Sequence, residues 1–133
     1  MTVAQAVSYV RDEEMGFETV VLADQDVAPT WHLAFQRALE PHEQDEALGM
    51  DSYCVTLPSG GCLYACLATV LIWDGNLRLD FHKDPVQELG LGSAELNLRL
   101  DLDADQLLAL GTGLQSVLGG ARNPPTLKGL LRP

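Results

Sequence analysis

The chain has 133 residues, of which 47% are apolar and 20% charged, a composition typical of a soluble domain with its own hydrophobic core. No apolar run reaches the roughly 18 residues of a membrane span, the first residues lack a secretory signal pattern, and three cysteines are an odd number for a disulfide framework. We therefore expect a single cytoplasmic domain over residues 1–133 with no membrane partner.

Charge is the most informative property of the composition. Asp and Glu outnumber Lys and Arg by 19 to 8, which gives a net charge of −11. Most of the excess lies in residues 1–60, which hold eleven acids against two bases. Because such a surface repels phosphate backbones, we expect no nucleic-acid partner. It suits a basic protein partner, although an acidic surface also serves solubility alone.

The N-terminal part of the chain predicts β-strands. Residues 3–14 are ambiguous between strand and helix, whereas residues 17–23 are rich in β-branched side chains, and together they predict a hairpin that turns at Met15–Gly16. The alternation of apolar and polar residues over 31–39 predicts another strand. An acidic connection follows over residues 40–51.

The centre of the predicted sheet is a meander. Its three apolar segments are residues 53–57, 62–72 and 77–81. Asp74-Gly75 separates the last two, and an Asp-Gly pair between apolar runs is a strong hairpin signal because Gly tolerates a positive φ. Residues 95–102 alternate Leu with polar residues, which predicts a further strand.

Two helices are predicted, a short one near residues 84–90 and a longer one that begins after Asp103. Asp103 and Gln106 have the spacing of a capping box, and Gly119-Gly120 ends the helix. Its predicted apolar face comprises Leu107, Leu110, Leu114, Val117 and Leu118. Gly111 and Gly113 each cost about 1 kcal/mol relative to Ala in a helix. Their presence therefore indicates a close approach to the sheet.

These elements predict an α+β fold, with a mainly antiparallel sheet and the C-terminal helix packed on one face. We expect the tail from about residue 121 to be loosely packed. The second face of the sheet is then either solvated or used for binding.

The cysteines predict core positions rather than a reactive or metal site. Cys62, Tyr64 and Cys66 share one face of a strand if the alternation holds throughout. The Cys-x-x-x-Cys spacing, without a second pair of ligands, favours buried thiols over zinc. Cys54 is also expected in the core.

No other catalytic or cofactor motif is present in the sequence. His42-Glu43 lacks the second His of a metalloprotease motif, and neither a phosphate-binding loop nor a nucleophile elbow occurs. An oxygen-rich cation site at Glu43, Asp45 and Asp51 stays an open alternative. We expect no catalytic residue, no cofactor and no metal, and hence a binding surface rather than an enzyme.

The segment from Gln44 to Cys54 resembles the Gln-Asp-x-Ala-Leu-Gly-Met-Asp-x-Tyr-Cys segment of the immunity protein 10 family of bacterial polymorphic toxin systems. A looser likeness extends from Phe17 to the Leu-rich helix near Leu114. The chain departs at Ala65-Cys66, where two glycines are expected. The resemblance implies a non-enzymatic cytoplasmic protein that binds and neutralises a cognate toxin.

We place the partner-binding residues in the acidic connection, at Glu40, Glu43, Asp45, Glu46 and Asp51. If the toxin is a basic nuclease, these acids would occupy its phosphate-binding site. The alternative is that the segment is structural and shapes the turn into the meander.

Two other functions remain open. A small-ligand-binding or dimerising regulatory module would use the open sheet face, near Trp31 or Trp73, whereas a hydrolase would use Cys54 or Cys66. Whether the chain is a monomer or a homodimer also stays open.

Overall fold

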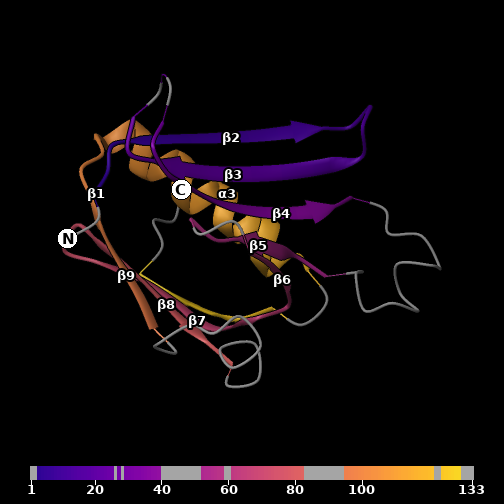
Figure 1. Cartoon of the computed structure of the whole chain (residues 1–133). Helices are drawn as coiled ribbons and strands as arrows, with labels where there is room; N and C mark the ends of the chain where they lie inside the picture. The colour runs from indigo at the N-terminus through magenta and orange to yellow at the C-terminus, as the bar shows by residue number, and fades with distance from the viewer. Residues whose placement is uncertain are drawn as a thin grey trace.

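The computed structural model describes residues 3–25, 27, 29–39, 52–58, 61–82, 95–121 and 124–129. Within these ranges, ten strands form two five-stranded sheets, and one long helix packs beside them (Figure 1). The predicted α+β fold with mainly antiparallel strands and a C-terminal helix is confirmed. The short helix predicted near residues 84–90 lies outside the described residues.

The first sheet is an antiparallel meander in the order β2-β3-β4-β5-β6. Its strands are β2 (Ala6–Asp12), β3 (Phe17–Ala23), β4 (His32–Ala38), β5 (Cys54–Thr56) and β6 (Cys62–Tyr64). The predicted N-terminal hairpin is β2–β3, and the strand predicted over residues 31–39 is β4. The inner face of this sheet has an apolar centre of four fully buried side chains that alternate along β3 and β4, namely Val20, Leu22, Leu33 and Phe35.

The second sheet has the order β1-β9-β8-β7-β10. Its strands are β1 (Val3–Ala4), β7 (Leu67–Trp73), β8 (Asn76–Phe81), β9 (Glu95–Leu100) and β10 (Thr126–Lys128). Asp74 and Gly75 form the tight β7–β8 turn with φ of 45° and 74°, as predicted. Because β10 pairs in parallel with β7, the tail is not loose at residues 126–128.

The chain crosses from the first sheet to the second at Ala65 and Cys66, so residues 62–72 are not one continuous strand. Ala65 has a φ of 49°, in the left-handed region, which breaks the strand alternation. Tyr53 fixes the crossing: its hydroxyl accepts the Leu67 N–H at 2.8 Å, and its carbonyl accepts the Ala65 N–H at 3.0 Å. Two sheets are therefore held together at this buried residue.

Helix α3 (Ala104–Gly119) has the predicted capping box between Asp103 and Gln106, and Gly120 is its C-cap. Gly113 makes the predicted close approach, because a Cβ there would overlap Val20 Cγ2 and lie 3.0 Å from the Tyr9 ring. In Figure 1, α3 lies behind β2, β3 and β4.

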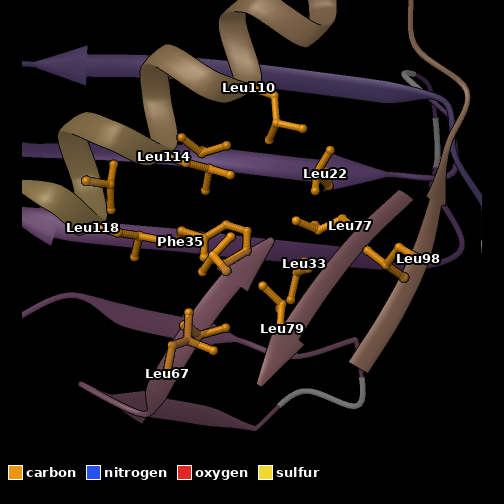
Figure 2. Close-up of a cluster of buried hydrophobic side chains, with 14 of the residues drawn as sticks. Leu22, Leu33, Phe35, Leu67, Leu77, Leu79, Leu98, Leu110, Leu114 and Leu118 are labelled. Atoms are coloured by element: carbon orange, nitrogen blue, oxygen red, sulfur yellow. The ribbon is translucent and has the colours of Figure 1, made fainter. Parts of the chain in front are cut away.

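The helix and the second sheet share the inner face of the first sheet. Figure 2 shows the core in which they meet, with side chains from α3, from β3 and β4, and from β7, β8 and β9. The fully or nearly fully buried members include Leu22, Leu33, Phe35, Leu67, Leu77, Leu79, Leu98, Leu110, Leu114 and Leu118. The inner face of the first sheet is therefore covered by the helix and the second sheet, and neither of them packs against the opposite, outer face.

Candidate partner-binding surface

The predicted contact residues lie outside the described residues, as does the alternative cation site formed from three of them. These contact residues are Glu40, Glu43, Asp45, Glu46 and Asp51. Of the segment from Gln44 to Cys54, the structure describes residues 52–54, and these have a structural role. Ser52 is buried, and Tyr53 is fully buried and holds the two sheets together. The candidate surface within the described residues is the outer face of the first sheet.

The strand register aligns the outer face into rows that run across the sheet. One row is Ser8, Val21, Ala34, Thr56 and Cys62, and the next is Val10, Thr19, Gln36, Cys54 and Tyr64. Shorter rows at the two ends are Ala6, Ala23 and His32, and Asp12, Phe17 and Ala38. Among these side chains, Asp12 alone is an acid and none is Lys or Arg. The outer face is therefore nearly uncharged on a chain of net charge −11.

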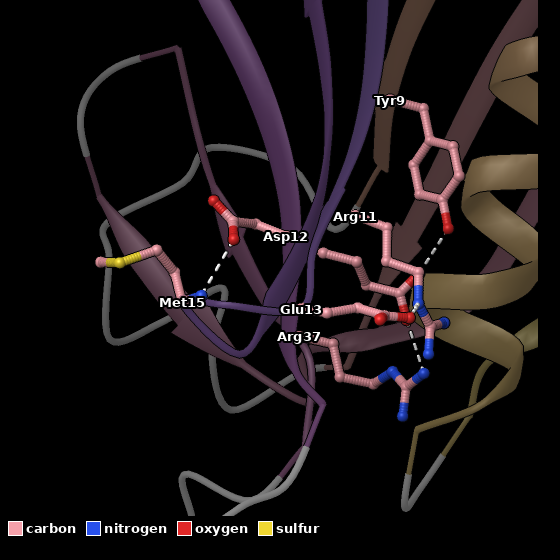
Figure 3. Close-up of polar contacts among 7 residues, drawn as sticks. Tyr9, Arg11, Asp12, Glu13, Met15 and Arg37 are labelled. Carbon is pink, nitrogen blue, oxygen red and sulfur yellow. Dashed lines mark hydrogen bonds and ion pairs between the residues drawn. The ribbon is translucent and has the colours of Figure 1, made fainter.

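Large apolar side chains are exposed on and beside this face. Val10 and Tyr64, at opposite ends of one row, are 51% and 39% exposed. Met15, in the turn between β2 and β3, is 72% exposed. Asp12 holds that turn, because its Oδ1 accepts the Met15 N–H at 2.9 Å and its carbonyl accepts the Gly16 N–H at 2.8 Å. Figure 3 shows the Met15 side chain on the side of the strands away from the helix.

A shallow pocket of about 250 Å³ lies at the other end of the outer face. It is lined by Ala6, Val7, Ser8, Val21, Ala23, Gln25, Pro29 and His32. Its β3–β4 loop is closed by Asp24, which accepts the Thr30 hydroxyl at 2.5 Å and the Thr30 N–H at 2.9 Å. The Thr30 hydroxyl is also the main cause that lowers the pKa of Asp24. The pocket is smaller than the ~300 Å³ lower limit of typical small-molecule sites.

The three cysteines do not share one environment. Cys62 is exposed and Cys54 is half-buried, and both lie on the outer face, whereas Cys66 is buried in the core. The predictions that Cys62 is a core thiol and that Cys62, Tyr64 and Cys66 share a face are wrong, because Ala65 breaks the alternation between them.

The thiol chemistry argues against a cysteine nucleophile. Burial raises the pKa of Cys54 to about 12, and the neighbouring Cys62 thiol acts on this pKa in the same direction. Burial likewise raises the pKa of Cys66 to about 12. Both thiols are therefore protonated near neutral pH and are poor nucleophiles. Across the described ranges, no group of three His, Cys, Asp or Glu side chains could hold a metal ion.

A buried charge pair supports the sheet beneath the Met15 turn. Glu18 is fully buried on the inner face of β3 and accepts hydrogen bonds from the Tyr9 hydroxyl at 2.9 Å and from Arg37 Nη2 at 2.5 Å (Figure 3). Arg37 Nη1 donates to the Gly120 carbonyl at 3.2 Å, which places a positive charge at the C-terminus of α3. These contacts tie β2, β3 and β4 to the end of the helix.

The ionised state of Glu18 is favoured despite its burial. Burial alone would raise the pKa of this carboxyl, but hydrogen bonds from Ser116, Tyr9 and Arg37, with the charge of Arg37, bring the pKa below its ordinary value. Sequence reasoning missed this pair. A signal was present, because Glu18 has the same parity in its strand as the buried Val20 and Leu22.

Comparison with known proteins identifies a matching family. The family model described as immunity protein 10 matches residues 3–108, which run from β1 into the start of α3. No curated protein and no solved structure matches the chain. Within the described part of the chain, no helix has the length and apolar character needed to cross a membrane. Because the family model covers most of the sequence, the chain belongs to the immunity protein 10 family.

Proposed function

We propose that this chain binds a cognate toxin domain of a bacterial polymorphic toxin system and neutralises it as a stoichiometric, non-catalytic inhibitor in the cytoplasm. The family membership carries this proposal, since the family is one of immunity proteins. The net charge of −11 supports a basic toxin, such as a nuclease, as the partner.

Part of the contact is assigned to the acidic connection between β4 and β5, at Glu40, Glu43, Asp45, Glu46 and Asp51. What supports this assignment is the sequence: residues 1–60 carry eleven of the nineteen acids and two of the eight bases. Opposite charges steer association, so these residues act mainly on the rate at which the complex forms. Carboxylates on this segment would occupy the site at which a nuclease binds phosphate.

The first experiment uses the toxin domain encoded beside the gene for this chain. Native mass spectrometry of the mixed proteins should give a one-to-one complex, and toxin activity should fall to zero at one equivalent of the chain. Titration without inhibition, or inhibition that continues far below one equivalent, would contradict the proposal.

The second experiment tests the acidic connection. Glu43→Lys should slow association several-fold at low ionic strength and reduce the dependence of the rate on salt. Asp101→Lys is the matched control, because it makes the same change in net charge at an exposed residue before α3. Equal effects of both variants would show that net charge acts alone, without a contact at residue 43.

A second candidate function is a small-ligand-binding or dimerising module without catalysis. The observation behind it is the pocket of about 250 Å³ on the outer face, which would take only a ligand smaller than those of typical small-molecule sites. Sedimentation and native mass measurements on the chain alone test it: this alternative requires a dimer or a co-purifying ligand.

A further inference from the structure

We infer that the outer face of the first sheet, together with Met15 in the adjoining β2–β3 turn, is a surface on which the toxin docks. The inference rests on the proposed function and adds a contact to it. The partner surface that fits is an apolar patch flanked by basic side chains.

The outer face carries less charge than the chain as a whole. Charged residues make up 20% of the chain, yet the sixteen aligned side chains of the outer face include one acid, Asp12, and no base. Solvated sheet faces usually carry interspersed charges, which keep them from associating. A face without them is suited to being covered by a partner.

Three exposed apolar side chains lie on or beside the outer face. Val10 and Tyr64 lie in one row of the outer face, and Met15 extends from the turn at the end of β2. Met and Tyr are enriched in protein interfaces relative to the rest of the surface. Because these side chains lie on one side of the sheet, a single partner surface can contact them together.

Hydrogen bonds within the chain hold the Met15 turn in place before any partner binds. Asp12 accepts two backbone N–H groups of the turn, and the Leu39 N–H donates to the Gly16 carbonyl at 2.9 Å, which ties the turn to the end of β4. A pre-organised contact loses little conformational entropy on binding. Met15 is therefore suited to insert into a pocket of the partner.

The chemistry around the turn favours a basic partner over a second copy of the chain. Asp12, Glu13 and Glu14 directly precede the exposed Met15 in the chain, and Arg11 Nε lies 3.5 Å from Glu13 Oε1. The turn keeps a net negative charge, so two copies meeting here would bring acids together, whereas a basic rim would be attracted.

The outer face alone is smaller than a standard protein–protein interface, so the partner must also contact other residues. Strands β2, β3 and β4 have seven residues each, and β5 and β6 have three each. At about 3.3 Å per residue and about 4.8 Å between strands, they present a flat area of roughly 400 Å². A standard interface covers about 800 Å² on each partner. The outer face therefore supplies about half of such an interface, and residues next to it supply the remainder.

The test removes apolar contact without changing charge or strand propensity. The Met15→Gln/Val10→Thr double variant keeps the side-chain lengths and the β-branched residue, and both positions are exposed, so the fold should be retained. Leu108→Gln is the matched control, because Leu108 is 43% exposed on α3, remote from the outer face. We expect the double variant to weaken binding of the toxin domain about tenfold or more through faster dissociation, and the control to bind as the wild type does.

A second measurement reads the surface without a mutation. Oxidation of Met15 by hydrogen peroxide should be fast in the free chain and should slow at least several-fold in the complex. Equal affinity of the double variant, with unprotected Met15 in a wild-type complex, would refute the docking surface and leave the proposed function standing. A wild-type chain that fails to bind the toxin domain would refute the proposed function and this inference together. A chain that dimerises through Met15 would show that the occupant is a second copy, which also overturns the inference.

Discussion

Replacing Glu18 by Gln should destabilise the protein strongly and should also remove part of its acid sensitivity. Glu18 is fully buried, while the Arg37 side chain is 19% exposed. The substituted amide would keep the size of the side chain but would leave the Arg37 charge without its counter-ion. Breaking a buried ion pair by removing one partner costs about 3–5 kcal/mol. Because Arg37 retains some solvent and its bond to the Gly120 carbonyl, we expect about 3 kcal/mol.

The pH dependence follows from the direction of the pKa shift. The folded state lowers the pKa of Glu18 because its hydrogen bonds and the charge of Arg37 outweigh the opposing effect of burial. A carboxyl with a lowered folded-state pKa contributes stability above its unfolded-state pKa, and that stability is lost as the pH falls through the folded-state value. The difference in unfolding free energy between wild type and Glu18→Gln should therefore be largest near neutral pH and should shrink in acid.

Urea unfolding at a series of pH values, followed by tryptophan fluorescence, measures this difference. Glu95→Gln is the matched control, because the Glu95–Arg78 pair has the same chemistry at 2.9 Å but is 38% and 40% exposed. Surface pairs contribute less than about 1 kcal/mol. In a double-mutant cycle, Glu18→Gln with Arg37→Met should show a coupling of about 2 kcal/mol. A cost below about 0.5 kcal/mol, or a difference independent of pH, would refute the reasoning.

Two further substitutions test how the sheets and the helix are held. Gly113→Ala should destabilise by about 1–2 kcal/mol net, because the new Cβ overlaps Val20 Cγ2 and this overpacking exceeds the gain of about 1 kcal/mol in helix propensity. Gly119→Ala in the same helix meets a Leu127 methyl at an ordinary 3.5 Å, so thermal denaturation should show it neutral or slightly stabilising; a matching loss in both variants would contradict this account. Tyr53→Phe should cost about 1–3 kcal/mol, because the buried N–H and carbonyl of Leu67 lose their hydroxyl partner. Denaturant midpoints unchanged from wild type would show that Tyr53 does not hold the two sheets together.

Local signals in the sequence were sufficient for most of the elements. The Asp74-Gly75 turn, the capping box at Asp103 and the close approach at Gly113 depend on neighbouring residues or on the absence of one side chain, and all three are confirmed. Such features can be predicted because their energetics are settled within a few residues of the chain.

The division into two sheets could not be predicted in the same way. It depends on a positive φ at Ala65, a residue with no preference for that region, and on the hydroxyl of Tyr53, which contacts Leu67 across the core. Both are consequences of tertiary packing. Because the break at Ala65 lies between the two cysteines, Cys62 is exposed while Cys66 is buried in the core. A prediction that assumed unbroken alternation therefore placed both thiols on the same face.

The sequence predicted that a candidate surface could exist on the second sheet face, but it did not predict which residues form that surface. The sequence indicated a second sheet face that is solvated or used, whereas strand register was needed to show that Val10, Gln36 and Tyr64 form one uncharged row. The charges along the sequence point to the acidic connection instead. A surface that is distinguished by its lack of charge is not visible in the sequence, because its residues come from separate strands.

The two buried polar contacts connect stability to the proposed binding role. Tyr53 fixes β5 relative to the second sheet, and the Glu18–Arg37 pair fixes β3 and β4 relative to α3. None of these three residues is among the aligned side chains of the outer face, yet together they hold the strands that present it. A surface held in this way can bind without first becoming ordered, so conservative changes at Glu18 should weaken toxin binding chiefly in proportion to the fraction of protein unfolded. Changes at Met15 should weaken binding while leaving the unfolding free energy intact.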